Sequence, residues 1–271
     1  MHHWSERGSQ AGSFGKGAVA WCTLMWDLLN DDLDWVLLEC TRHYRHPHLE
    51  VVLAHIGASV FPVVFSPSHL DLPCTRYRKY MLILFSPSLR WNSNAAAISM
   101  TSLLSSFGRK PAGSGSDFLQ KTPKSEVRAE IEAMAENMHM SSRDGSGNRW
   151  PMKIVLSRSM QRSLAAHDGQ LKKGGWDLTK DGVFTTICQQ GSYAATSAMI
   201  PALLQRSKVW SWRHQRLLLP RERCNVMGME WTPEIASIEP SKIYSMTGTA
   251  MNLTAISSVI VYMLSTCIPE G

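Results

Sequence analysis

Residues 35–41 read WVLLECT, and this stretch decides how the first third of the chain is interpreted. Its unbroken apolar run is typical of a strand that is buried on both faces. Two further short apolar runs, at residues 60–65 and 80–85, also predict strands. Apolar residues at helical spacing over residues 18–30 predict a helix, and a second helix is expected over residues 47–55. Strands that alternate with helices predict a mostly parallel α/β sheet.

The rest of the chain changes in texture. Residues 86–125 are rich in Ser, Gly, Pro and Lys, which predicts a long insert or linker. Residues 126–140 form a good helix by propensity, and the apolar segment 250–267 predicts a terminal helix. The Trp-rich middle of the chain has no clear period, so it receives no assignment.

Composition limits the class of protein. The chain has 271 residues, 28 basic and 22 acidic side chains and a net charge of +6, which suits a polyanionic partner without requiring one. Its six cysteines include no C-x-x-C pair, which argues against a zinc ribbon or a dithiol redox site. We therefore predict reduced thiols and no metal site.

Neither end of the chain suggests a membrane. The first seven residues lack a basic start followed by an apolar run, so no secretory signal is expected. The apolar stretches 51–65 and 253–264 are too short or too interrupted to span a bilayer. We expect an intracellular protein, inside or outside the nucleus, with no membrane partner; its oligomeric state is left open.

Charged residues stand at the ends of two predicted strands. Glu39 follows the apolar run at 35–38, where the edge of a parallel sheet commonly holds ligands. Arg76 and Arg78 precede the strand at 80–85, and at this spacing on an extended segment they point the same way, as a pair of cations for a carbonyl or a phosphate. The plainer alternatives are a solvated carboxylate and ordinary surface arginines.

Two segments near the C-terminus resemble helix starts. Residues 216–222 read RLLLPRE, in which Pro220 fits a first helical turn and Glu222 lies near its positive end. Residues 248–252 read GTAMN and precede the last helix, where Gly248 would let backbone amides approach a ligand. Both segments could equally be ordinary capping devices.

In their order and spacing, these segments resemble the cytosine-C5 DNA methyltransferase family. In that family Glu-Asn-Val follows a strand, Pro-Gln-x-Arg-x-Arg precedes another, Arg-x-Leu-Thr-x-Arg-Glu follows a variable recognition region, and Gly-Asn-Ala-Met/Val opens the terminal helix. The matching segments here are residues 38–41 (LECT), 73–78 (PCTRYR), 216–222 (RLLLPRE) and 248–251 (GTAM). The likeness covers residues 18–85 and 195–267, about half of the chain.

The resemblance implies methyl transfer from S-adenosylmethionine to carbon 5 of a cytosine that has left the duplex stack. Glu39 would contact and protonate nitrogen 3, Arg78 would contact the base carbonyl, and Arg76 would support the catalytic site. Gly248 and Thr249 would line the cofactor pocket. DNA is the implied partner, with transfer RNA as the alternative.

The residues that would contact nucleic acid lie in the third matching segment. Arg216 and Arg221 are predicted to bind nucleic acid and, with Glu222, to organise the recognition region.

The chain also departs from the family pattern. Asn and Val after the Glu are Cys40 and Thr41, and Gln before the arginine pair is Cys74. The family's Phe-x-Gly-x-Gly cofactor turn and its Pro-Cys-Gln nucleophile loop are not found. The glycine-rich residues 12–17 have no strand before them, so they do not match the cofactor turn. The Pro-Cys at residues 73–74 follows Glu39, whereas the nucleophile of the family precedes its Glu. We expect a methyltransferase relative that is inactive as written because it lacks the nucleophile.

The corresponding fold is a partial Rossmann-like, S-adenosylmethionine-dependent methyltransferase fold with an inserted target-recognition region. Residues 1–85 would form a partial catalytic α/β domain, and residues 86–245 the insert, linker and recognition region. Residues 246–271 would form a terminal helix that returns to the catalytic domain. The alternative is a non-catalytic nucleic-acid-binding or interaction protein that uses the basic surface.

Overall fold

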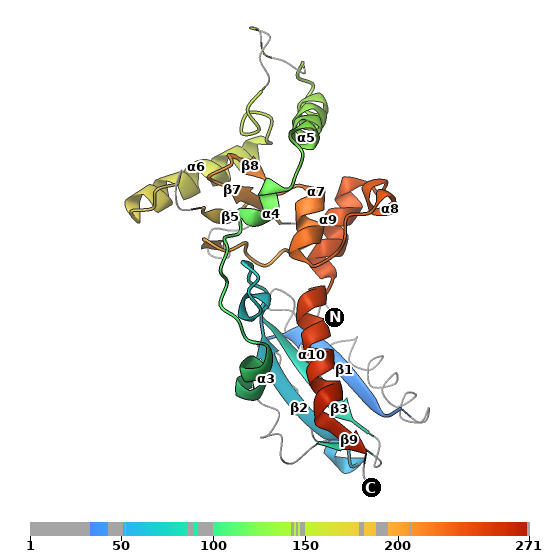
Figure 1. Cartoon of the computed structure of the whole chain (residues 1–271). Coiled ribbons are helices and arrows are strands. Elements are labelled where there is room, and N and C mark those ends of the chain that lie inside the picture. The colour runs from blue at the N-terminus through green and yellow to red at the C-terminus, as the bar shows by residue number, and fades with distance from the viewer. Residues whose placement is uncertain are drawn as a thin grey trace. The chain divides into compact units, whose positions relative to one another are not determined.

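The computed structural model describes residues 33–42, 51, 53–85, 89–91, 100–141, 144, 146, 150–178, 182–187, 195–205 and 207–269. The chain forms two compact units (Figure 1). The first unit comprises residues 1–70, 77–110 and 255–271, and the second comprises residues 71–76 and 111–254. The helix expected at residues 18–30 lies outside the described residues. Of the helix expected at 47–55, residues 51 and 53–55 are described, and they are helical.

The first unit is built on a three-stranded sheet of β1 (Trp35–Thr41), β2 (Ser59–Phe65) and β3 (Arg78–Leu84), in the order β1-β3-β2. The three strands coincide with the three apolar runs. β3 lies in the middle and pairs antiparallel with both neighbours, so the prediction of a mostly parallel sheet is wrong for the described strands. The reason is the connection from β2 to β3, which contains only the short 3-10 helix η3 (Pro67–His69) instead of a crossover helix. Apolar runs identify strands, but they do not set strand direction.

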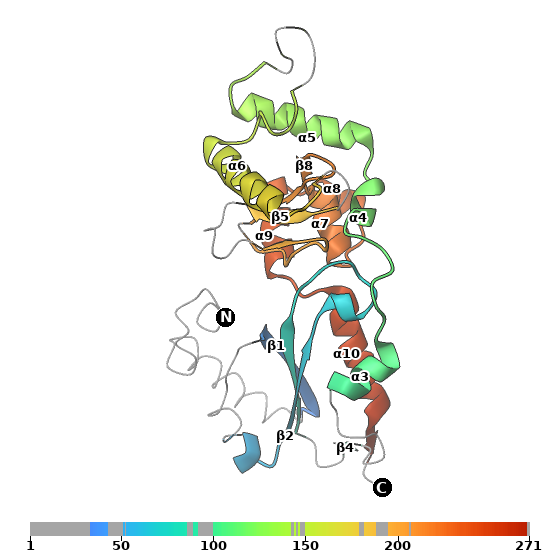
Figure 2. The same cartoon turned by 90° about the vertical axis from the view of Figure 1, so that its left-hand side faces the viewer.

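Each face of this sheet is covered. On one face, Val63, Tyr80 and Leu82 pack against α3 (Met100–Phe107) and α10 (Leu253–Thr266), both of which lie on the same side of the sheet in Figure 2. On the other face, Cys40, Met81 and Ile83 pack with Leu53. A two-stranded sheet of β4 (Leu89–Trp91) and β9 (Cys267–Pro269) completes the described part of the first unit.

The second unit contains a four-stranded antiparallel sheet in the order β6-β5-β7-β8. Its strands are β5 (Phe184–Ile187), β6 (Thr196–Ser197), β7 (Lys208–Ser211) and β8 (Arg216–Leu217). One face, with Ile187 and Trp210, packs against α5 (Lys124–Asn137) and α6 (Arg158–Lys173). The other, with Phe184 and Val209, packs against α4 (Asp117–Gln120) and α7 (Pro220–Val226). Two further helices, α8 (Pro233–Ala236) and α9 (Pro240–Thr249), follow α7.

Several expectations can be compared directly with these elements. The structure confirms three predicted helices: α5, which helix propensity predicts; α7, which begins at Pro220 as predicted; and α10, which lies in the apolar C-terminal segment. The region 86–125 is not merely a linker, because it contains β4, α3 and α4. The first unit extends through α3 to residue 110, because Leu103 of α3 packs into its core. The chain then forms the second unit and returns to the first unit at residue 255.

The stretch Pro240–Thr266 is long and apolar enough to cross a membrane. It is two helices, however, because α9 ends at Thr249 and Ala250 is extended. Ala255, Val259, Tyr262 and Met263 on α10 are buried in the core of the first unit, which is the pattern of an amphipathic core helix. That the protein has no membrane partner stays a prediction.

Candidate functional site

Glu39 and Arg78, predicted to contact one base, form an ion pair in the first unit. Arg78 Nε lies 2.8 Å from Glu39 Oε1, and the two side chains are only 12% and 18% exposed for Glu39 and Arg78, respectively. Glu39 stands opposite Tyr80 in the β1-β3 register, so Glu39 and Arg78 are diagonal neighbours on one face of the sheet. The antiparallel register therefore brings together two residues that are 39 positions apart in the sequence.

The pair offers a carboxylate and a guanidinium at one partly desolvated place. A carboxylate accepts hydrogen bonds while a guanidinium donates several, so together they complement a ligand edge that carries both a donor and an acceptor. Next to the pair, Tyr80 meets Phe65 edge to face, with ring centroids 6.5 Å apart. Buried aromatic rings behind a charged pair lower the local polarity and strengthen its electrostatic interactions.

Arg76 is not part of this ion pair. It belongs to the second unit, where its Nη1 donates to Leu203 O at 2.7 Å and its Nη2 donates to Ala250 O at 2.7 Å. A weaker bond at 3.4 Å goes to Gly248 O. The guanidinium is buried at the C-terminal end of α9, where the helix dipole favours a cation. Arg76 thus connects two of the matching segments by holding the chain after α9 in place.

Gly248 and Thr249 do not fit the cofactor-lining role implied by the resemblance. Gly248 lies inside α9, and a Cβ there would overlap the backbone of Leu204 and Gln205. The space that the glycine leaves open is therefore filled by protein. The hydroxyl of Thr249 donates to Ser245 O and Met246 O of its own helix. These two residues terminate and pack α9, and α10 begins only at Leu253.

Arg216 forms a buried ion pair with Glu222. Its Nη1 and Nη2 donate to the two carboxylate oxygens at 2.8 and 2.6 Å, and Glu222 is fully buried. The same carboxylate accepts from Thr122 Oγ1 at 2.7 Å and from Leu219 N at 2.8 Å. A guanidinium enclosed in this way is not available to a phosphate, so the predicted nucleic-acid contact of Arg216 is corrected to the organising role.

Arg221 is more accessible than Arg216. Its side chain is 31% exposed, and its Nε lies 2.8 Å from Glu126 Oε2 on α5. The guanidinium lies 5.4 Å from the centre of the Trp231 ring. Arg221 therefore keeps an exposed side on which a nucleic-acid contact is geometrically possible, and that contact stays a prediction.

The described cysteines give no activated nucleophile. Cys40, Cys74, Cys224 and Cys267 are free thiols. Burial raises the pKa of Cys40 and of Cys74 to about 12, so both are protonated at neutral pH. Cys40 lies on the face of the sheet opposite to Glu39, with its thiol 3.6 Å from Lys79 O. Cys74 lies in the core of the second unit, so its thiol is not exposed to a substrate.

Two buried polar residues of the second unit were missed by sequence reasoning. Arg223 is fully buried, and within the described chain its hydrogen bonds go to neutral oxygens of Thr247, Ser207, Leu204 and Tyr244. Asn252 donates to Val226 O at 2.8 Å. Arg223 directly follows the matched RLLLPRE segment and has no periodic signal of its own, so only the fold reveals its burial.

Comparisons with known proteins give similarity at the level of solved structures. No protein-family model and no curated protein sequence matches the chain. The chain is similar to the Dnmt2 methyltransferase of S. pombe, with 14% identity and a TM-score of 0.44 over 89% of this chain and 71% of that one. A triple mutant of Spodoptera frugiperda DNMT2 gives 14% identity and a TM-score of 0.43, over 90% and 71%. The Entamoeba histolytica methyltransferase EhMeth gives 12% and 0.44, over 89% and 68%.

Proposed function

We propose that this chain is a relative of the cytosine-C5 methyltransferases that binds a cytosine at the Glu39–Arg78 pair but does not itself transfer a methyl group. The 2.8 Å ion pair between the first two matching segments carries the proposal. Two further contacts support it, because Arg76 joins the second segment to the fourth and Arg216 pairs with Glu222 inside the third. Glu39, Arg76, Arg78 and Arg216 each contact either another matching segment or their own.

The pair suits the edge of an unpaired cytosine. The Glu39 carboxyl group, in its protonated form, would donate to ring nitrogen 3, and the Arg78 guanidinium would donate to the neighbouring carbonyl. Both atoms are occupied by the partner base inside a duplex, so the cytosine must first leave the stack. DNA is the expected partner, and transfer RNA is the alternative.

Absence of methyl transfer follows from the missing nucleophile. Attack on carbon 6 needs a thiolate, and the sequence contains no Pro-Cys-Gln. The buried thiols of Cys40 and Cys74 are protonated, so neither replaces it. S-adenosylmethionine would supply the methyl group in an active relative, but Gly248 and Thr249 do not fit it.

Two measurements test the proposal. With labelled S-adenosylmethionine and either cytosine-containing DNA or transfer RNA, we expect no incorporation of label, and clear turnover would contradict the inactive assignment.

The binding assay uses a DNA duplex with one cytosine opposite an abasic site, because this removes most of the cost of extruding the cytosine. Arg78→Met should weaken binding of this duplex by about tenfold, the size of one lost charged hydrogen bond, while Lys110→Met, at an exposed position, should not.

The choice of base provides the control for that binding assay. Replacing the unpaired cytosine with thymine changes ring nitrogen 3 from an acceptor to a donor. Wild-type protein should prefer cytosine, and Glu39→Met, which removes the donor to nitrogen 3, should reduce the preference. Equal binding of the two bases by wild-type protein would rule out base contact by the pair.

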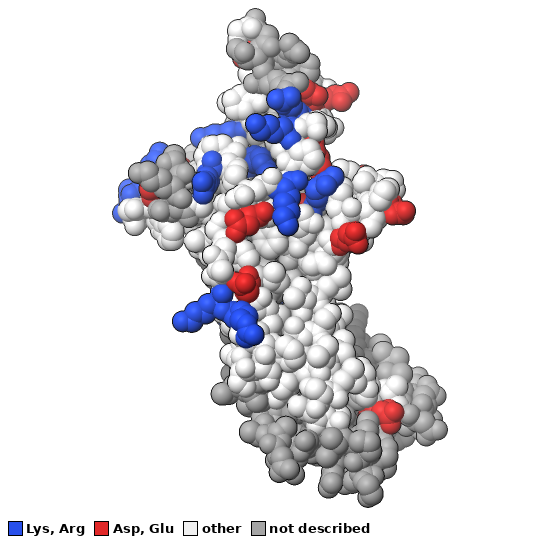
Figure 3. All heavy atoms as spheres, in the orientation of Figure 1, with Lys and Arg blue, Asp and Glu red and all other residues white. Residues whose placement is uncertain are grey.

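A second candidate function is non-catalytic binding of nucleic acid through α6. Arg158, Arg162 and Lys173 are exposed on this helix, and Trp176 just beyond it is 40% exposed. Figure 3 shows Lys and Arg side chains gathered over α5, α6 and α7 of the second unit. Exposed cations near an aromatic ring favour a phosphate backbone with accessible bases.

A further inference from the structure

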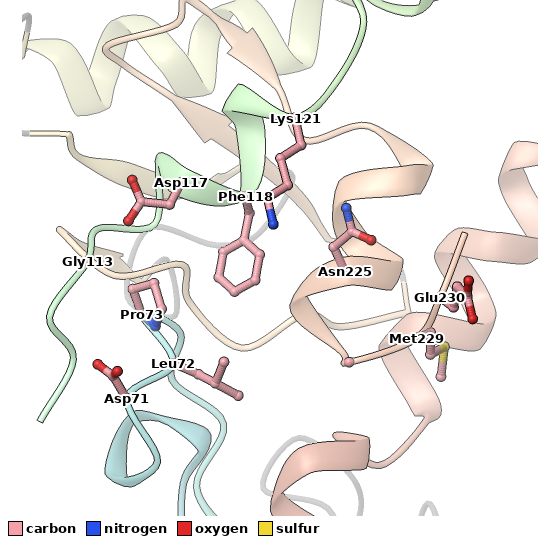
Figure 4. A pocket seen from close by; sticks show the side chains of 11 residues that line it. Asp71, Leu72, Pro73, Gly113, Asp117, Phe118, Lys121, Asn225, Met229 and Glu230 are labelled. Carbon is pink, nitrogen blue, oxygen red and sulfur yellow. The ribbon is translucent and has the colours of Figure 1, made fainter. Parts of the chain in front are cut away.

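The second unit contains an open cavity of about 540 Å³ between α4 and the end of α7. Figure 4 shows Phe118 projecting from α4, Lys121 from the C-terminal cap of α4, and Asn225 from α7. Leu72 and Pro73 contribute from the segment that precedes Arg76. The volume lies within the range of small-ligand sites in proteins.

The walls of the cavity are held by the buried ion pair described above. Glu222, on α7, accepts from Thr122 directly after α4, and Arg216 Nη2 lies 3.4 Å from Leu119 O within α4. The pair therefore ties the helix that carries Phe118 to the helix that carries Asn225. A cavity whose walls are fixed before binding loses little entropy when a ligand enters.

The far side of the cavity is formed by a helix ending of the Schellman type. Met229 N donates to Cys224 O and Gly228 N donates to Asn225 O, with Gly228 at a positive φ of 75°. This turn places Met229 and Glu230 on the lining. Gly228 is needed here, because a side chain would be strained at this φ and would press on Thr254.

The lining combines an aromatic ring with polar side chains. Phe118, Leu72 and Met229 are half-buried and provide the apolar surface. In the described part of the chain, no hydrogen bond or ion pair engages the side-chain amide of Asn225, the ammonium of Lys121 or the carboxylate of Glu230. An unpaired amide offers a donor and an acceptor side by side.

Charge narrows the class of ligand. Asp71, Asp117 and Glu230 line the cavity together with a single lysine, so negative charges outnumber positive ones. Asp71 and Asp117 accept backbone hydrogen bonds from Ala112 and Ser114. A phosphate would be repelled by these carboxylates, whereas sugar hydroxyls would donate to them.

We propose that this cavity binds a nucleoside through its base and sugar, without its phosphate. The base stacks on Phe118, the amide of Asn225 binds the donor and acceptor edge of the base, and the carboxylates receive the sugar hydroxyls. The nucleoside is either free in solution or one extruded residue of a nucleic-acid strand whose phosphates stay outside. The cavity lies wholly in the second unit, so the inference does not depend on the cytosine contact proposed for Glu39 and Arg78.

Calorimetric titration of the 271-residue chain with adenosine, guanosine, cytidine and uridine, and with their 5′-monophosphates, tests the proposal. We expect at least one nucleoside to bind with a Kd below about 1 mM and its monophosphate to bind at least about threefold more weakly. Phe118→Ala should weaken binding about tenfold, as expected for one lost stacking contact. Met138→Ala removes another exposed apolar side chain of the second unit and should have no effect.

Further variants keep the test decisive. If Phe118→Ala loses its cooperative thermal transition, Asn225→Leu replaces it, because that change keeps the side-chain size but removes both hydrogen-bonding groups. Lack of binding by all four nucleosides, tighter binding of the monophosphates, or wild-type affinity in a folded Phe118→Ala or Asn225→Leu variant would overturn the proposal. Lys110→Gln, at an exposed position in the first unit, should leave nucleoside affinity unchanged.

The two sources are distinguished with single-stranded oligonucleotides that carry either the preferred base or an abasic residue at the centre. A strand that binds more tightly than the nucleoside, and that loses this advantage when abasic, identifies an extruded residue. A nucleoside that binds at least as tightly as the intact strand identifies a free ligand. Either result supports a nucleoside site.

Discussion

Arg76 and Arg78 stand two positions apart, but the fold gives them different tasks. Arg78 pairs with Glu39 across the β1-β3 ladder, whereas Arg76 donates to carbonyl groups of Leu203 and Ala250. Their spacing on an extended segment predicted that both would point the same way. The extended ladder of β3 begins only at Arg78, so the alternation rule does not reach back to Arg76.

At the same scale, the buried thiols predict a pH dependence. Burial raises the pKa of Cys40 and of Cys74 to about 12 from an ordinary value near 9.0. Between these values the folded chain retains protons that the unfolded chain releases, so this contribution to stability is complete below pH 9 and is lost as the pH rises toward 12. Urea midpoints should therefore fall steadily above pH 9.

Alkylation by iodoacetamide, mapped by mass spectrometry, checks the same thiols residue by residue. In the folded chain Cys40 and Cys74 should react much more slowly than the partly exposed Cys267. In urea all three should react alike. Equal rates in the folded chain would mean that the two thiols are not buried as described.

At the scale of elements, α9 depends on a glycine that its helix propensity does not explain. Gly248→Ala should destabilise the fold by at least about 2 kcal/mol, because the added methyl group overlaps the backbone of Leu204 and Gln205. Gly169 on α6 is the matched control, since nothing lies within 4 Å of a Cβ there. Gly169→Ala should stabilise by about 0.5–1 kcal/mol through helix propensity. Chemical denaturation of both variants checks the pair, and a neutral Gly248→Ala would contradict the close packing.

At the scale of the whole molecule, the net charge of +6 predicts salt-sensitive binding to nucleic acid. If Arg158, Arg162, Lys173 and one further cation contact phosphates, affinity should fall by about 100-fold between 50 and 200 mM salt. Arg162→Gln should reduce the slope of log K against log salt by about one. Lys110→Gln, an exposed lysine in the first unit, should leave the slope unchanged. Fluorescence anisotropy at several salt concentrations measures both slopes, and a slope near zero would exclude a phosphate contact by α6.

The sequence by itself determined where some of the regular elements of this protein lie. Apolar runs, helix propensity and Pro220 located β1, β2, β3, α5, α7 and α10, because burial, propensity and capping act over a few neighbouring residues. Motif order singled out Glu39 and Arg78 before their contact was known. The direction of the strands, the burial of Arg216 and the separate role of Arg76 were decided only by the tertiary structure. Each of these depends on partners tens of residues away, and no local pattern records which distant carbonyl or carboxylate will meet a given side chain.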